Sequence, residues 1–526
     1  MKTIKKAISM LTAVSILATS FGTVPVLATD LMNPPVAEVV QGQLRGYMDD
    51  NTYTFLGVPY ANVPERFAMP EEAKAWEGIR DAQAYGPTCR IPEQTSVGDD
   101  EMVWPHRYWI QDENCQSLNI WTQQLDPSAK RPVMVFMHGG GHTNGSSIEA
   151  VAYEGKNLSE YGDVVVVTLN HRLNVLGYLD LSAYGEEYKY SGNAGAADLV
   201  AALEWIHKNI AVFGGDPENV TIFGQSGGGG KVLTMLHTEE TSELVDKVIV
   251  QSGGLSLLSK ENSQRVAAKT LENLGLDESQ IDELKTIPYA DLINAGTLAL
   301  SQVSEETMEY IDWGPVADET FIHTDLCEWT SDVPLMVGST FSEFTSTFRM
   351  GDGRKNEWNT EETMSYLTER FGDNAKAVAD EFETVFPNKT TADAYFYATD
   401  FRQYVTDAAQ EKLNAGTAPV YTYLFSYEAP VNGGTSAFHC VDLIYAFHNV
   451  EIPILTRATG GNEDALRIQD EVASAWVNFA ATGNPSQKDL EWAAYTPEEK
   501  NVMQFDIESK CSVLGDDTLI ELMTAR

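Results

Sequence analysis

Several features that define other protein classes are missing from this sequence of 526 residues. Its five cysteines and nine histidines include no C-x-x-C motif and no histidine cluster, so the sequence predicts no metal ion and no other cofactor. Apart from the N-terminal stretch, no apolar run is long enough to span a membrane. Basic residues are also few: 35 Lys and Arg stand against 77 Asp and Glu, giving a formal charge of -42. Such a surface disfavours binding to nucleic acid or to an anionic membrane.

The chain also lacks the linkers and repeats that would divide it into several units. No Pro/Gly/Ser-rich linker, internal repeat or low-complexity tract interrupts it, and 43% of its residues are hydrophobic. We therefore expect a single domain over residues 29–526. Residues 1–28 begin with three lysines, continue through an apolar stretch and end in V-L-A. This pattern is typical of a cleavable secretory signal peptide, with a lone membrane anchor as the alternative, so we expect an exported protein without stable membrane insertion.

A glycine-rich turn around Ser226 is the most informative stretch of the chain. The residues V-T-I-F at 220–223 predict a strand, and G-Q-S-G-G follows at 224–228. A G-x-S-x-G sequence between a strand and a helix forms a tight turn that exposes the serine hydroxyl at the helix N-terminus. A glycine-rich connection without chemistry is the alternative interpretation of the motif alone. Ser226 is therefore a candidate nucleophile if its partners are present elsewhere.

Those partners are a base, an acid that orients the base, and N–H donors for an oxyanion. H-G-G-G at 138–141 follows an apolar run and is typical of an oxyanion loop. Glu343 follows a predicted strand at 335–340, and His439 lies between a β-rich segment and an apolar helical segment. The chain order Ser226, Glu343, His439 is that of α/β-hydrolases. The fold class that we predict is α/β, with a mostly parallel central sheet flanked by helices.

These motifs together resemble the type-B carboxylesterases, the family of bacterial p-nitrobenzyl esterases, animal carboxylesterases and cholinesterases. The similarity runs from G-V-P-Y-A at 57–61 to W-V-N-F-A-A-T-G-N-P at 476–485. Its most specific part is N-I-A-V-F-G-G-D-P-E-N-V-T at 209–221. By position, the resemblance implies a catalytic triad and an oxyanion hole made of Ser226 (nucleophile), Glu343 (acid), His439 (base), and Gly140, Gly141 and Gly227 (oxyanion donors).

The resemblance has further consequences for the cysteines and for the cap of the site. It implies a disulfide between Cys89 and Cys115, while the sequence leaves the pairing of the other cysteines open: these are Cys327, Cys440 and Cys511. The helical and acidic segments 255–332 and 351–415 interrupt the series of predicted strands and are candidates for a cap.

The predicted function is a secreted serine carboxylesterase that hydrolyses small-molecule esters. Two residues depart from the pattern of many family members, which have Glu before the nucleophile and Ala after it; here these are Gln225 and Gly227. Cholinesterases use that Glu to help hold a cationic substrate, so Gln225 argues against a choline ester. The same triad also serves hydrolysis of amides or carbamates, or a lyase step, and a non-catalytic binding protein is a further alternative.

Overall fold

The computed structural model describes residues 34–525, except for residues 95, 97, 99, 100, 102, 347–353 and 432. The expected signal segment, residues 1–28, lies outside the described residues. So do residues 351–353, the first of the second expected cap segment.

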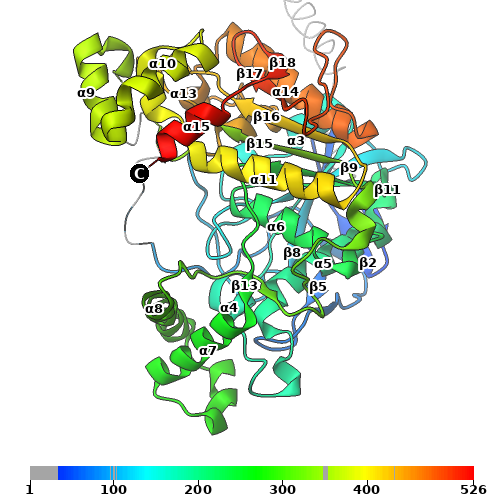
Figure 1. Ribbon diagram of the computed structural model, residues 1–526. Helices are drawn as coiled ribbons and strands as arrows, with labels where there is room; N and C mark the ends of the chain where they lie inside the picture. The colour runs from blue at the N-terminus through cyan, green and yellow to red at the C-terminus, as the bar shows by residue number, and fades with distance from the viewer. Residues whose placement is uncertain are drawn as a thin grey trace, which may run out of the picture.

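A sheet of eleven strands forms the centre of the described chain (Figure 1). From one edge to the other it contains β18 (Lys510–Val513), β17 (Asn501–Phe505), β16 (Val420–Phe425), β15 (Leu335–Thr340), β12 (Lys247–Gln251), β11 (Gly215–Gln225), β9 (Arg131–Met137), β10 (Val165–Leu169), β8 (Ser117–Thr122), β4 (Thr52–Pro59) and β3 (Tyr47–Asp49). The strands from β17 to β10 in this order pair in parallel. The outer strands pair antiparallel. The predicted α/β fold class is confirmed.

Helices cover both faces of this sheet, because successive residues of a strand point to opposite sides and both sides are buried. On β9, Met134 and Phe136 belong to one apolar cluster, whereas Val133, Val135 and Met137 belong to another. The helices of the first cluster include α3 (Lys156–Gly162), α12 (Val441–Ala446) and α14 (Glu463–Thr482). Those of the second include α5 (Ala194–Asn209), α6 (Gly227–Leu236) and α11 (Thr399–Ala415).

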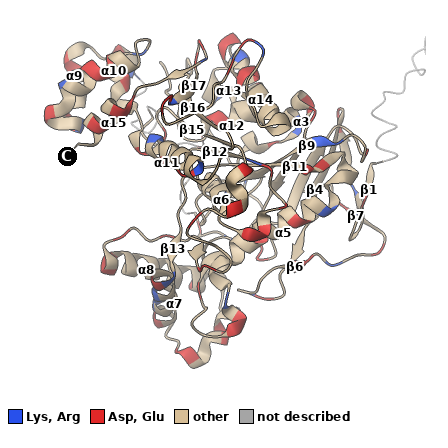
Figure 2. Ribbon diagram, turned by 45° about the vertical axis from the view of Figure 1, so that its right-hand side comes forward, with Lys and Arg blue, Asp and Glu red and all other residues tan. Residues whose placement is uncertain are grey.

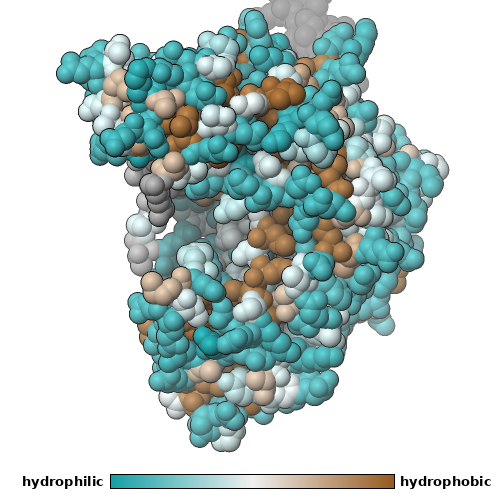
Figure 3. Space-filling view, in the orientation of Figure 1, coloured by the Kyte–Doolittle hydropathy of each residue, from teal (hydrophilic) through white to brown (hydrophobic). Residues whose placement is uncertain are grey.

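The two expected cap segments are helical and lie in different parts of the molecule. In the first, α7 (Lys260–Leu274) packs against α8 (Tyr289–Thr307), and the pair lies at the bottom of Figure 1. In the second, α9 (Thr360–Phe371) and α10 (Ala375–Val385) lie at the upper left. A space-filling view shows apolar side chains gathered between the upper and lower parts of this face (Figure 3).

Acidic residues are spread over most helices of the described chain, as the ribbon in Figure 2 shows. Within the described ranges, no helix is both long enough and apolar enough to cross a bilayer. Among the same residues, no three His, Cys, Asp or Glu side chains converge on a position that could hold a metal ion.

Candidate active site

The turn between β11 and α6 holds Ser226 in a backbone conformation that is rare for residues other than glycine. Its φ is 59° and its ψ is -126°, values that cost free energy and persist only where the surroundings enforce them. The Ser226 N–H donates to the carbonyl of Gln251 at 2.8 Å. At Gly224, an added Cβ would lie 2.4 Å from the carbonyl oxygen of Gly228, so the flanking glycines allow the chain to turn this tightly. The predicted strand-to-helix turn is therefore present.

Glu343 and His439 meet beyond the ends of β15 and β16. Glu343 Oε2 contacts His439 Nδ1, and the main-chain N–H of His439 donates to the Glu343 carbonyl at 3.1 Å. The other carboxylate oxygen of Glu343 accepts hydrogen bonds from Ser252 Oγ at 2.6 Å and from the Thr340 N–H at 2.7 Å. The Glu343 residue is only 1% exposed. Because the carboxylate accepts a hydrogen bond from Nδ1, the proton of the neutral ring resides there, and Nε2 is the basic nitrogen.

Gln225 is a contact of His439 that the sequence did not reveal. Its side-chain nitrogen lies 3.1 Å from His439 Nε2, and its oxygen accepts a hydrogen bond from the Cys440 thiol at 3.1 Å. In the described part of the chain, no hydrogen bond joins Ser226 Oγ to His439. The structure thus brings Glu343 and His439 into direct contact and leaves His439 Nε2 bonded to Gln225.

Two of the three residues expected to form the oxyanion hole, Gly141 and Gly227, lie against each other at the start of α6. A Cβ added to Gly227 would be 2.4 Å from the Cα of Gly141 and 2.5 Å from its nitrogen. Gly140 and Gly141 have φ values of 82° and 61°, a region that favours glycine. The loop can approach Gly227 this closely only because neither segment carries a side chain.

Asp442, three residues after the histidine, adds a second buried carboxyl group near the acid. Its Oδ2 accepts hydrogen bonds from Gln251 Nε2 at 2.9 Å and from the Tyr423 hydroxyl at 2.8 Å. Burial raises the pKa of Asp442 to about 6; these two hydrogen bonds lower the value, while the charge of Glu343 raises it. A lone Asp in an apolar segment gave no sequence signal for this contact.

The structure joins no two of the five cysteines by a disulfide, Cys89 and Cys115 included. Both residues of the expected pair are buried. Burial raises the pKa of Cys115 well above its usual value, and a hydrogen bond to Cys89 raises it further. A thiol that keeps its proton is a poor nucleophile for disulfide formation. The structure therefore brings the two side chains together, and the disulfide between them stays a prediction.

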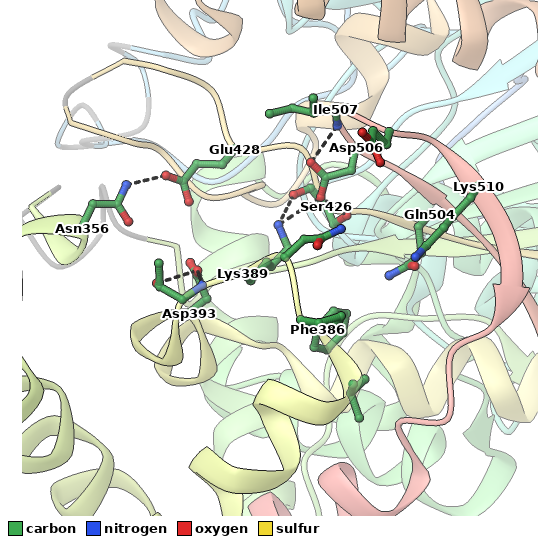
Figure 4. Close-up of a pocket in the computed structure, with 15 residues that line it drawn as sticks. Asn356, Phe386, Lys389, Asp393, Ser426, Glu428, Gln504, Asp506, Ile507 and Lys510 are labelled. Atoms are coloured by element: carbon green, nitrogen blue, oxygen red, sulfur yellow. Dashed lines mark hydrogen bonds and ion pairs between the residues drawn. The ribbon is translucent and has the colours of Figure 1, made fainter.

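A cavity of about 510 Å³ lies apart from these residues, beside the loop after α10 and the ends of β16, β17 and β18 (Figure 4). Lys389 donates to the carbonyl of Ser426 at 2.8 Å and to Asp506 at 3.1 Å. Asn356 likewise donates to Glu428 at 2.6 Å. None of the three expected triad residues lines this cavity, so it is not a candidate for the ester chemistry.

A parallel sheet with a nucleophile turn at the end of a central strand defines a serine hydrolase of the α/β-hydrolase class. The carboxylesterase family model matches residues 33–518. The chain therefore belongs to the carboxylesterase family, and it is a carboxylic ester hydrolase of the serine type.

Individual relatives agree with this assignment. The chain is 30% identical to the para-nitrobenzyl esterase of Bacillus subtilis, over 91% of this chain and 96% of that protein. It is also 30% identical to the phenmedipham hydrolase of Pseudarthrobacter oxydans, over 90% and 95% of the two chains. A solved structure of an esterase from Clostridium hathewayi, described as able to hydrolyse aliphatic aromatic polyesters, is 39% identical. The match covers 93% of this chain and 98% of the esterase chain, with a TM-score of 0.86.

The close packing of Gly227 predicts the effect of adding a single methyl group. Gly227→Ala places a Cβ against the backbone of Gly141, so the glycine loop must move away from Ser226. Loss of one oxyanion donor costs about 10²- to 10³-fold in kcat, and we expect a fall of at least about tenfold on p-nitrophenyl butyrate. Gly314→Ala is the control, because its added Cβ meets nothing nearer than 3.4 Å. Wild-type kcat in Gly227→Ala would contradict the prediction.

Proposed function

We propose that this enzyme hydrolyses its esters through an acyl-enzyme on Ser226, with His439 as the base and Glu343 as the acid. The contact between Glu343 Oε2 and His439 Nδ1 carries the proposal, because it leaves Nε2 as the nitrogen that takes up a proton. The strained turn at Ser226 supports the role of the serine, since such turns project the nucleophile from the sheet.

The reaction has two halves. In the first, His439 Nε2 removes the proton from Ser226 Oγ as the oxygen attacks the ester carbonyl. The N–H groups of Gly140, Gly141 and Gly227 stabilise the negative oxygen of the tetrahedral intermediate. His439 then gives the proton to the departing alcohol. In the second half, water loses a proton to His439 and attacks the acyl carbon. His439 then returns the proton to Ser226 Oγ as the carboxylic acid leaves.

Gln225 must give way before the first step. Its amide donates to the Nε2 of His439 at 3.1 Å, and that lone pair has to accept the Ser226 proton instead. Because the Gln225 amide is uncharged, it also provides no electrostatic attraction for a cationic alcohol group.

Replacing the nucleophile tests this mechanism. Ser226→Ala is expected to lower the hydrolysis of p-nitrophenyl acetate, butyrate and octanoate by at least about 10⁴-fold, because no acyl-enzyme can form. Ser256→Ala, which changes an exposed serine, is the matched control and should keep wild-type rates. Circular dichroism checks folding, and mass spectrometry of enzyme treated with a fluorophosphonate should show the adduct on Ser226. Retained turnover in folded Ser226→Ala would refute the mechanism.

We further propose that the acyl group accepted by this enzyme includes an aromatic ring. The Phe344 ring lies 4.0 Å from the His439 ring, centroid to centroid, and Phe401 lies 5.3 Å from it. The Tyr404 ring lies next to Phe401, with 5.6 Å between the ring centroids, and extends this row of aromatic rings. The side chains of Phe344 and Tyr404 are both 46% exposed, so a flat substrate group can stack on them. The description of the Clostridium hathewayi esterase, which names aromatic polyesters, supports the same substrate class.

Loss of this aromatic surface should discriminate between substrates with the same alcohol. Phe344→Ala is expected to raise the KM for ethyl benzoate by about 3- to 10-fold, while the KM for ethyl butyrate changes by less than about twofold. Hydrolysis is followed by acid release at constant pH. Tyr161→Ala is the matched control, because Tyr161 is also an exposed aromatic stacked on a histidine, His448, at 4.1 Å. Equal changes for both esters would contradict the role of Phe344.

We also propose that the protein is secreted and that residues 1–28 are removed on export. The basic start, the apolar stretch and the small residues before position 29 support this. Intact-mass measurement of the exported protein should show a chain that begins at Thr29, and a full-length mass would contradict cleavage.

A further inference from the structure

Lys231 is a buried lysine on α6, the helix that begins directly after Ser226. The residue is 1% exposed, although lysine is rarely buried completely because burying an ammonium group is costly. Its neighbours on the helix, Val232 and Leu233, are also buried. The ammonium group donates a hydrogen bond to the carbonyl oxygen of His138 at 2.8 Å. His138 is the first residue of the glycine loop that faces Ser226.

Three successive carbonyl groups of this loop each have a donor. The His138 carbonyl accepts from Lys231, and the Gly139 carbonyl accepts from His138 Nδ1 at 2.9 Å. The Gly140 carbonyl accepts from the Asn144 N–H, also at 2.9 Å. In a trans peptide the N–H points opposite to the C=O. The carbonyls of His138, Gly139 and Gly140 share their peptides with the N–H groups of Gly139, Gly140 and Gly141, so holding them fixes those three N–H directions in turn. Lys231 holds the first of these peptides. Lys231 is the charged donor of the three.

The surroundings of Lys231 make it the main positive charge beside the loop. Burial lowers the pKa of His142 to about 3, and the charge of Lys231 lowers it further. The same two causes hold the pKa values of His138 and His171 well below the usual range. The three imidazoles are therefore neutral at the pH values where an esterase works. The titratable side chains that face Lys231 are His138, His142, His171, Glu149 and Cys89.

We propose that Lys231 is a positioning residue for the reaction: its ammonium group anchors the peptide between His138 and Gly139, where the loop that carries Gly140 and Gly141 begins, and its charge favours the oxyanion. The inference rests on the proposed function of Gly140 and Gly141 as oxyanion donors. It adds a charged group on α6 that supports a loop whose own donors are main-chain amides.

A role for the charged form of Lys231 makes kcat depend on pH. Burial lowers the pKa of Lys231 to about 7, although the charge of Glu149 acts in the opposite direction. The ammonium form is therefore present below about pH 7 and is lost as the pH rises through that value. Because His439 must be neutral to act as base, kcat should also fall at low pH. The wild-type enzyme should show a bell-shaped kcat profile with an alkaline limb near pH 7.

Substitution of Lys231 tests the assignment. Lys231→Met should lower kcat at pH 6.5 by about 10- to 100-fold, keep KM within about twofold, and abolish the alkaline limb. Lys231→Arg, which stays charged, should retain more activity than Lys231→Met and move the limb above about pH 9. Lys412→Met is the matched control, because Lys412 is also 1% exposed and its Nζ lies 3.5 Å from a carbonyl, that of Ser331. The control should keep the wild-type profile.

These measurements distinguish a positioning role of Lys231 from a purely structural one. They also distinguish failure of the Lys231 proposal from failure of the proposed function. Circular dichroism and thermal melting establish that each variant is folded. A folded Lys231→Met with wild-type kcat and an unchanged alkaline limb overturns the proposal. If that variant does not fold, the wild-type profile decides: a kcat that stays constant from pH 6.5 to 9 overturns the proposal. Failure of the proposed function itself would show separately, as turnover retained in Ser226→Ala.

Discussion

A row of main-chain hydrogen bonds, formed where the parallel strands end, fixes the side chains around Ser226. The Ser226 N–H donates to the Gln251 carbonyl at 2.8 Å, and the Ser252 N–H donates to the Gly338 carbonyl at 2.7 Å. These bonds join β11 to β12 and β12 to β15 just past their last paired residues, so the strands stay in register while the chain turns. The turning residues Ser226, Ser252 and Glu343 have φ values of 59°, 47° and 47°. The strain at these residues is tolerated because the sheet holds the strand that leads into each turn.

Much of the sheet could be predicted from the sequence because its central strands are buried on both faces. Such strands appear as short apolar runs, and the strand predicted at 335–340 coincides with β15 (Leu335–Thr340). The turn at Ser226 could be predicted equally well, because only glycine tolerates the backbone contacts beside it. The export signal and the roles of the triad stay predictions. The export signal lies in residues outside the described chain, and the roles of the triad concern steps of the reaction.

Other features of the site depend on contacts between distant segments and had no local signal. Lys231 follows four glycines and could equally have been a solvated helix residue, but α6 packs it beneath the loop that begins at His138. The contact between Gln225 and His439 joins residues far apart in the chain. The expected disulfide depends on oxidation as well as on position. Cys115 forms a hydrogen bond with Cys89, and the bond between their sulfur atoms stays a prediction.

The acidic surface bears on how the product leaves. An uncharged ester experiences no net repulsion from a protein with a formal charge of -42, whereas hydrolysis creates a carboxylate of the same sign as the protein. The acidic side chains spread over the helices (Figure 2) produce a field that pushes this anion outward and slows its return. Product inhibition is thereby weakened without any specific contact. Because dissolved ions screen the field over about 10 Å at 0.1 M salt, clearance of the product depends on ionic strength even though binding of the substrate does not.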